Sequence, residues 1–436
     1  MIRYGLDSVL DNKKTAAYGL QHLVMFIANS VVISVIAANG IGLGKAETSG
    51  MLLRTFFLCG VLSVVQTRLG HRYPIIDGPS GLWLSVLINL TTAAASAAGD
   101  IAALRSQIEF GMAVAGVIVA ALGISGAMKH IARLFTPLVN GVFLVLMPVQ
   151  LSKSIVQGMF GTVYGGSRID PKEFAAFWLT VAVMIAVNIF GSAFLKSIAI
   201  LIAIAAGWVF AACAGIADFG IMSGGSFFMP PRPFAWGVPS FNPGIIITCV
   251  FATFLLFSNF ISSCYGMADV IGESFSEKQL NRGTMCFGLS TAVTGLFATV
   301  GFVPFGSSMG VIRMTGVAAR KPFYLGSIAM VALGLIAPVG LFFASIPPSV
   351  GYGALFVLFA IIMKQGIDNF KKAALTERTG LAAGLAMLTA TGIMMQPPAV
   401  FDSLPDAAAP FVSNGLLVGV ILAVVLEQAL KERNRF

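Results

Sequence analysis

Charged side chains are scarce in this sequence. Aspartate, glutamate, lysine and arginine make up only 10% of its 436 residues, whereas 57% of the residues are hydrophobic. Charged residues form roughly a quarter of an ordinary soluble domain, so this composition excludes a soluble fold. Apolar runs of about 20 residues, enough to cross a bilayer as a helix, recur from Tyr18 to Leu426 with short polar breaks. The sequence therefore predicts an all-α polytopic membrane protein without a soluble domain.

Histidine and cysteine are also sparse, which limits the available chemistry. The three histidines, His22, His71 and His130, form no His-x-x-x-His or Glu-x-x-His pair, the spacing that a helical metal site uses. The five cysteines lie in or beside apolar runs at unrelated spacings, as small core residues do: Cys59, Cys213, Cys249, Cys264 and Cys286. A membrane enzyme would need a metal cluster or a nucleophile with its base. We therefore expect no enzyme activity and no cofactor.

Fourteen membrane segments account for the apolar runs. The first seven lie near residues 18–37, 50–67, 80–97, 109–128, 136–152, 174–194 and 197–216. The second seven lie near 244–263, 283–302, 307–319, 323–344, 348–363, 380–396 and 410–428. An even number of crossings returns the chain to the side on which it started.

The distribution of lysine and arginine tests this count, because cytoplasmic loops collect them. With a cytoplasmic N-terminus, 19 of these residues fall on inner segments, ending with Lys431, Arg433 and Arg435, and seven fall on outer segments: Lys45, Arg54, Arg105, Lys153, Arg168, Lys172 and Arg232. Basic loops on one face explain the net charge of +9 without a nucleic-acid partner. We predict that both termini are cytoplasmic, that no signal peptide is cleaved, and that the compact loops belong to a bacterial plasma (inner) membrane protein.

Two of the predicted segments are interrupted at matching positions. The Pro- and Gly-rich stretch 73–80 precedes the third segment, and an extended piece, 303–306, precedes a short helix from Ser307 in the tenth. The fifth and twelfth segments also begin alike, at 136–141 and 347–353. Because seven is odd, the second set of seven runs inverted relative to the first. Inverted repeats with broken helices in corresponding positions indicate a midplane substrate site in a secondary transporter.

The starts of these half-helices carry candidate substrate-binding groups. A helix that begins in mid-membrane exposes backbone N–H groups and the positive end of its dipole. Two such ends, at Ser80 and Gly81 and at Gly306, Ser307 and Ser308, would suit a planar, acceptor-rich or anionic ligand. The serine hydroxyls would either contact that ligand or only cap their helix.

Four further polar residues lie at membrane depth. Asp77 is a candidate proton carrier, because an acid in the membrane is costly and usually functional, although Asp-Gly-Pro-Ser is also good turn chemistry that would cap the helix from Gly81. Gln21 and His22 supply a paired donor and acceptor, or pack within the bundle. The Asn259 amide has the donor and acceptor that a nucleobase edge requires, or packs between helices.

These residues resemble the nucleobase-ascorbate transporter family, also called nucleobase:cation symporter-2, over nearly the whole chain. Gln21-His22, the Pro-rich break before the third segment, and Gly310 with Thr315 carry the resemblance. The chain departs from the family where members usually have a glutamate in the eighth segment, here Asn259, an acid or Gln at Ser307, and a signature Arg at Gly316. Asp77 before Gly-Pro is similar to a divergent branch of purine permeases.

The resemblance implies a core domain (1–132 and 244–344) and a gate domain (133–217 and 345–436) that move against each other, commonly with proton coupling and often as a homodimer. It implies a secondary active permease for a nucleobase, a purine such as xanthine, urate or hypoxanthine rather than uracil. The alternatives are an anion transporter of similar seven-plus-seven fold, for sulfate, bicarbonate or a carboxylate, and an uncoupled nucleobase facilitator.

Overall fold

The computed structural model describes residues 2–96, 100–163, 166, 168–217, 226–373, 376–401, 403–405 and 408–430. The predicted C-terminal cations Lys431, Arg433 and Arg435 lie outside them. In the first half of the chain the helices are α1 (Asn12–Gly40), α2 (Lys45–Leu69), α3 (Gly81–Ser96), α4 (Ile101–Ser125), α5 (Met128–Ala132), α6 (Pro137–Phe160), α7 (Pro171–Phe190), α8 (Ala193–Ser197) and α9 (Ala199–Cys213).

The second half continues in the same manner. Its helices are α10 (Pro243–Ile271), α11 (Glu277–Leu296), α12 (Ser307–Thr315), α13 (Arg320–Leu333), α14 (Ala337–Ala344), α15 (Pro348–Lys372), α16 (Glu377–Met395), α17 (Ala409–Val412) and α18 (Gly415–Ala429), with a 3-10 turn at Pro398–Phe401. Two short strands, β1 (Asp77–Pro79) and β2 (Phe302–Pro304), lie directly before α3 and shortly before α12.

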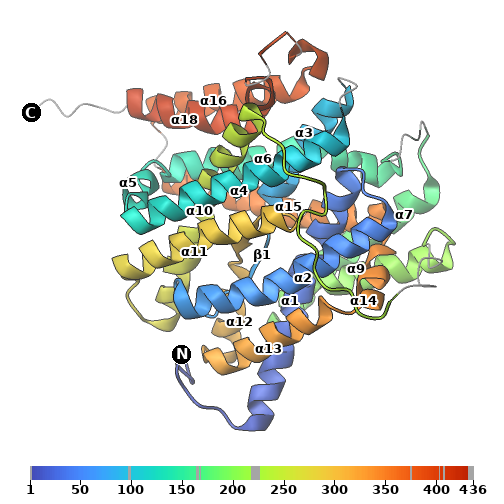
Figure 1. The fold of residues 1–436 in the computed structure, drawn as a ribbon, viewed down its shortest axis with the longest axis vertical. Coiled ribbons are helices and arrows are strands. Elements are labelled where there is room, and N and C mark those ends of the chain that lie inside the picture. The colour runs from blue at the N-terminus through green and yellow to red at the C-terminus, as the bar shows by residue number, and fades with distance from the viewer. Residues whose placement is uncertain are drawn as a thin grey trace, which may run out of the picture.

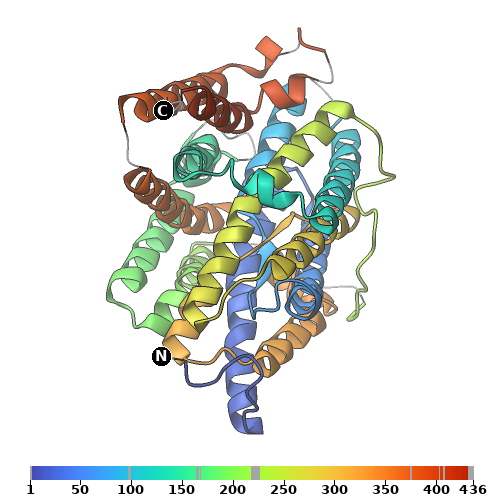
Figure 2. The same cartoon turned by 90° about the vertical axis from the view of Figure 1, so that its left-hand side faces the viewer.

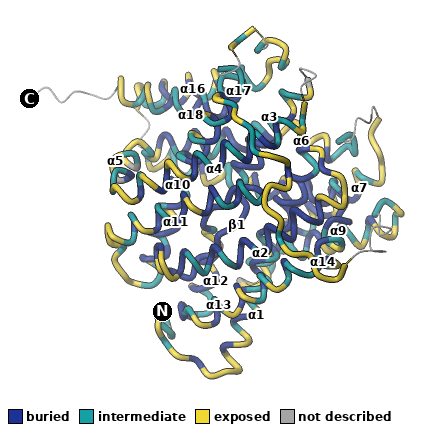
Figure 3. The backbone as a smooth tube through the Cα atoms, in the orientation of Figure 1, coloured by how far each residue is buried: buried dark blue, intermediate teal, exposed yellow. Residues whose placement is uncertain are grey.

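The prediction of an all-α membrane protein is confirmed. Within the described residues, 7 helices are long and apolar enough to cross a membrane, namely α1, α2, α4, α6, α7, α10 and α15, and α3, α9 and α18 are shorter apolar helices. Side chains on the outside of the bundle are often large and apolar, such as Phe190, which is 84% exposed. Figure 3 shows the buried residues along the middle of the helices, as expected when lipid replaces water around the outer surface.

Two predicted segments are each divided into two helices, and one cation needs reassignment. The predicted segment 410–428 is α17 and α18. The predicted segment 323–344 is α13 and α14, because the backbone of the segment 226–242 inserts where they meet: Met229 donates its N–H to Leu335 O (2.9 Å) and Ala337 donates to Phe227 O (3.0 Å). Arg54, counted among the outer cations, lies inside α2 and is buried.

The helices pack in two groups (Figure 1). In one group, α4 packs on α10 and α11, and α13 packs on α1 and α2. In the other, α15 packs on α6 and α7, α18 packs on α16 and α6, and α9 packs on α7. Helices α1, α3 and α10 also contact members of the second group.

The strand pair lies in the middle of the first group. β1 and β2 run antiparallel with Asp77 opposite Pro304, Gly78 opposite Val303 and Pro79 opposite Phe302. All six strand residues are buried, and α1, α2, α10 and α11 pack around the pair. In Figure 2 the strands run beside the long helix α1. Residues far apart in the sequence, before α3 and before α12, therefore share one short ribbon.

The segment 226–242 leads into α10 and runs over the first group of helices (Figure 1). Phe228 pairs with Ile336, and Phe234 donates its N–H to Leu296 O (2.7 Å). Ser240 Oγ and Ser106 Oγ of α4 lie 2.7 Å apart and share a hydrogen bond. Hydrogen bonds therefore hold the segment 226–242 against this group of helices at several points along its length.

Candidate functional site

Backbone hydrogen bonds place the starts of α3 and α12 at the two ends of one ribbon. Phe305 donates its N–H to Ile76 O (2.8 Å), and Ser80 donates its N–H to Gly301 O (2.9 Å). α3 begins at Gly81, directly after the second of these bonds, and α12 begins at Ser307, two residues after the first. Because each helix follows an extended piece, its first backbone N–H groups begin inside the protein and not at its surface.

Ser307 and Ser308 occupy different environments. Ser308 is buried, and its Oγ accepts a hydrogen bond from the Ile76 N–H (3.0 Å). Ser307 and the preceding Gly306 are exposed. Ser308 therefore fastens the two interrupted segments together, whereas Ser307 and Gly306 are open to a ligand.

Asp77 is buried at the first residue of β1. Its backbone N–H donates to Ser63 Oγ of α2 (2.9 Å), and its Oδ2 has no hydrogen-bond partner in the described part of the chain. Ser80, also buried, caps α3 instead: its Oγ accepts from the Leu82 N–H (3.2 Å). The helix start is thus capped by Ser80, and the predicted capping role of Asp77 is not seen.

Gln21 and His22 lie about three turns into α1. The His22 ring is buried and meets the ring of Phe323 edge-on, with centroids 5.3 Å apart and planes at 83°. The His22 Cβ also lies close to Gly326. These contacts place His22 at the interface of α1 with α13, while Gln21 is half-buried beside it.

Helix α10 joins the ribbon to the second group of helices. Ser263 Oγ donates to Pro304 O of β2 (3.0 Å), and Ser258 Oγ donates to Asn140 Oδ1 of α6. Asn259, between these two serines, is half-buried. The same helix therefore supports β2 and faces the other group, with Asn259 on the intervening turn.

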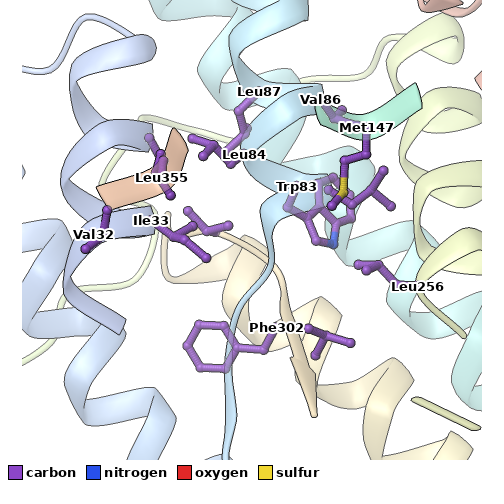
Figure 4. Packing of buried hydrophobic residues seen from close by; sticks show 14 of the residues in the cluster. Val32, Ile33, Trp83, Leu84, Val86, Leu87, Met147, Leu256, Phe302 and Leu355 are labelled. Atoms are coloured by element: carbon purple, nitrogen blue, oxygen red, sulfur yellow. The ribbon is translucent and has the colours of Figure 1, made fainter. Parts of the chain in front are cut away.

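The start of α3 also touches the second group. A side chain at Gly81 would lie 3.2 Å from Phe359 of α15 and 3.8 Å from Met147 of α6. Figure 4 shows Trp83 pointing toward Met147 and Leu256, above Phe302 of β2. Trp83 fills the bundle in this arrangement, and Gly81 lies where the two groups of helices meet.

The sequence reasoning missed several polar residues that shape this region. Ser63 and Ser263 hold the backbone of β1 and β2, and each looks like an ordinary small residue in an apolar run. Glu109 is fully buried in α4, where its Oε1 accepts from the Trp236 N–H (3.0 Å). An acid at membrane depth indicates a functional residue. Glu109 is the first residue of the predicted segment 109–128, so its sequence position alone is compatible with the membrane surface.

Comparison with known proteins decides the family. A family model named Xan_ur_permease and described as "Permease family" matches residues 13–399. This chain belongs to that permease family. The resemblance to nucleobase-ascorbate transporters is thereby confirmed.

Named relatives match this chain over nearly their whole length. The chain is 30% identical to "Putative purine permease YwdJ" of Bacillus subtilis, over 95% of this chain and 96% of that protein. It is 24% identical to "Xanthine permease" of the same organism, over 95% of this chain and 93% of that protein. The family assignment makes this chain a multi-pass membrane transport protein.

Among solved structures, the chain is similar to the transmembrane domain of a cyanobacterium bicarbonate transporter, BicA. The two share 14% sequence identity with a TM-score of 0.62, and the match covers 94% of this chain and 98% of that one. At this identity the likeness concerns the fold alone.

No group of three or more His, Cys, Asp or Glu side chains that could hold a metal ion is found among the residues that the structure describes.

Proposed function

We propose that this protein is a secondary active nucleobase permease that carries a purine such as xanthine, urate or hypoxanthine in preference to uracil. The observation that carries the proposal is the buried ribbon of β1 and β2, which brings the starts of α3 and α12 together inside the bundle. The names of the relatives, purine permease and xanthine permease, support the substrate class.

Recognition would use groups that match the edges of a purine. The exposed Ser307 hydroxyl and the backbone N–H groups of Gly306 and Ser307 would donate to ring nitrogens or exocyclic oxygens. The next two N–H groups, of Ser308 and Met309, already donate to Phe305 O and Gly306 O. Asn259 would offer a donor and an acceptor from α10, and Ser80 and Gly81 would bound the ligand on the opposite side. Gln21 and His22 would add a donor and an acceptor from α1, on the side of the core domain where α1 packs on α13.

Transport would move the core domain (1–132 and 244–344) against the gate domain (133–217 and 345–436). In support of this division, α4, α10 and α11 pack together within the first set of ranges, and α6, α7 and α15 pack together within the second. Contacts between the two sets, such as the hydrogen bond from Ser258 to Asn140, are ones that a sliding motion would break and remake. We propose fourteen crossings with both termini in the cytoplasm of the plasma (inner) membrane, and a homodimer in the bilayer.

We assign proton coupling to Asp77, whose carboxyl is buried with one oxygen unpaired. A buried acid that gains or loses a proton changes its interaction with the surrounding backbone, so it can make one conformation conditional on proton uptake. Because Asn259 and Ser307 replace the family's carboxyl positions, an uncoupled facilitator is the second form of the same function.

An anion transporter for sulfate, bicarbonate or a carboxylate is the alternative from another substrate class. The shared fold with BicA favours it, since two facing helix starts also suit an anion. The sequence identity and coverage of the purine and xanthine permeases favour a nucleobase.

Thermal stabilisation of the purified protein in detergent separates these functions, because a ligand that binds the folded state raises Tm. We expect xanthine, urate or hypoxanthine to raise Tm, and Asn259→Ala and Ser307→Ala to abolish the shift, whereas Ser262→Ala, one turn further along α10, keeps it. A shift with sulfate or bicarbonate alone would replace the nucleobase by an anion.

A further inference from the structure

A basic cavity lies away from the interrupted helices, at the predicted cytoplasmic ends of α2 and α13. Its volume is about 380 Å³. Asp7, Tyr324 and four uncharged residues form part of its lining. The rest of the lining is four cationic side chains, Arg68, Arg72, Arg320 and Lys321. One carboxylate therefore faces four cations.

The carboxylate is already engaged. Asp7 accepts a hydrogen bond from Arg320 Nη1, and the Arg320 side chain is only 17% exposed. Arg320 Nε donates to Arg72 O (2.9 Å), and the Arg320 backbone N–H donates to Leu6 O (3.0 Å). These bonds build a fixed wall from the N-terminal segment, the turn after α2 and the start of α13. Asp7, the one carboxylate that lines the cavity, is paired with Arg320, so Arg68, Arg72 and Lys321 have no further carboxylate partner among the lining residues.

Two local features of this wall are unfavourable: a strained backbone at Arg72, and cations crowded at an uncapped helix start. An anion would relieve the second of them. Arg72 has φ of 71°, in the left-handed region that a non-glycine residue rarely adopts. α13 begins with Arg320 and Lys321, has no acidic residue in its first turn and has no side-chain cap, although the positive end of a helix dipole disfavours cations there. A bound anion would offset both the crowded charges and the uncapped helix start.

Exposed apolar side chains occur on the segments that line the cavity. Val9 is 83% exposed, Leu69 follows Arg68 and is 61% exposed, and Ile328, one turn beyond Tyr324 along α13, is 62% exposed. A soluble anion gains nothing from this strip. A lipid would place its headgroup among the cations and its acyl chains along α13.

We propose that this cavity binds the phosphate headgroup of an anionic membrane phospholipid. The site is separate from the permease site and does not rest on the proposed substrate. Basic pockets between helices on the cytoplasmic side recognise phosphate headgroups through charge and hydrogen bonds, and arginine matches a phosphate with two parallel donors.

The test is the melting temperature of the purified full-length protein in neutral detergent, titrated with dioctanoyl phosphatidylglycerol, dioctanoyl phosphatidylcholine or inorganic phosphate. We expect phosphatidylglycerol to raise Tm and the other two to have little effect. The triple variant Arg68→Gln/Arg72→Gln/Lys321→Gln should bind phosphatidylglycerol at least about tenfold more weakly.

A matched variant, Lys364→Gln/Lys371→Gln/Lys372→Gln, removes three cations from the end of α15 and should keep the full shift. Equal weakening in both triple variants would overturn the proposal in favour of general surface charge. Equal stabilisation by phosphatidylcholine would overturn it as well, and a shift with inorganic phosphate alone would overturn the lipid as the source of the phosphate.

Arg72→Gly keeps the test decisive if the triple variant does not fold. Glycine adopts positive φ without strain, so this variant should melt at or above the temperature of the unmodified protein while binding phosphatidylglycerol more weakly. Unchanged binding by Arg72→Gly, together with a stable fold, would remove Arg72 from the site and contradict the cavity assignment.

Discussion

The backbone N–H of Ile76 donates to Ser308 Oγ over 3.0 Å, joining the stretch before α3 to the first turn of α12. Ser307, its neighbour, is exposed and makes no such link. Adjacent serines in one motif therefore differ in their surroundings: Ser308 holds the two interrupted segments together, and Ser307 is exposed.

Ser308→Ala should destabilise the protein by about 1–3 kcal/mol, because it leaves a buried N–H without an acceptor. Ser307→Ala should leave the melting temperature of the ligand-free protein nearly unchanged and abolish the stabilisation by xanthine. Melting curves with and without xanthine check both variants. A large loss of stability in Ser307→Ala, with none in Ser308→Ala, would reverse this assignment.

Asp77→Asn should abolish purine accumulation driven by a pH gradient in proteoliposomes while leaving exchange of purine across the membrane measurable. The amide keeps the size of the side chain but cannot gain or lose a proton in the pH range of transport. Asp269→Asn, at an exposed position near the end of α10, is the matched control and should accumulate normally. Undiminished accumulation by Asp77→Asn would exclude this carboxyl from coupling.

Reversible crosslinking tests the motion between the domains. Asn140→Cys with Ser258→Cys places two thiols where a hydrogen bond now joins α6 to α10. Oxidation should block uptake and reduction should restore it, provided that transport separates these helices. Each single cysteine variant controls for oxidation elsewhere, and full uptake by a crosslinked protein would show that this contact stays fixed.

Close packing of α4 on α11 depends on glycine. A Cβ at Gly288 would lie within 3.0 Å of the Ala120 backbone and of Gly116 O, so Gly288→Ala forces the helices apart. We expect a loss of about 1–3 kcal/mol, as in other overpacked cores. Gly384→Ala in α16 meets no atom within 4 Å and should be neutral or slightly stabilising. Melting temperatures of the two variants decide the matter.

The stability of the fold should fall in mild acid because of His71, which lies in the turn after α2. Burial lowers the pKa of His71 from 6.5 to about 3. Its Nδ1 accepts from the Tyr73 N–H (3.0 Å), and protonation would remove this acceptor. Between pH 6.5 and 3 the unfolded chain binds the extra proton and the folded chain does not, so stability decreases as pH falls through that window.

Melting temperatures of the detergent-solubilised protein at pH 7.5 and 5.0 measure this effect. The decrease between the two should be smaller in His71→Gln than in the unmodified protein. His130→Gln, at an exposed position, should show the same decrease as the unmodified protein. An identical pH dependence in all three proteins would contradict the role of His71.

The helices were predictable because a membrane span is a local property: an apolar run of sufficient length specifies α1 or α10 without reference to the rest of the chain. The interruptions before Gly81 and Ser307 were visible as local Pro and Gly. The break between α13 and α14 was not, because it depends on bonds from the distant residues Phe227 and Met229.

The site was predictable in part for the same reason. Ser80, Gly81, Gly306 and Ser307 follow from the interruptions themselves. The burial of His71, which follows the end of the predicted segment 50–67, arises from Phe260 and Gln279 on other helices. Ser63 could not be distinguished from other serines, since only the fold brings its hydroxyl to the Asp77 backbone.

The pairing of β1 with β2 also has a consequence for the order of biosynthesis, because the two strands are synthesised at different times. β2 leaves the ribosome more than 220 residues after β1, which at 5–20 residues per second is a delay of roughly 10–45 s. Throughout that interval the N–H and C=O groups of β1 have no strand to pair with, and lipid offers them no partner. The first half of the chain therefore cannot complete its insertion alone, and a nascent protein released before Pro304 would carry an open strand edge into the membrane.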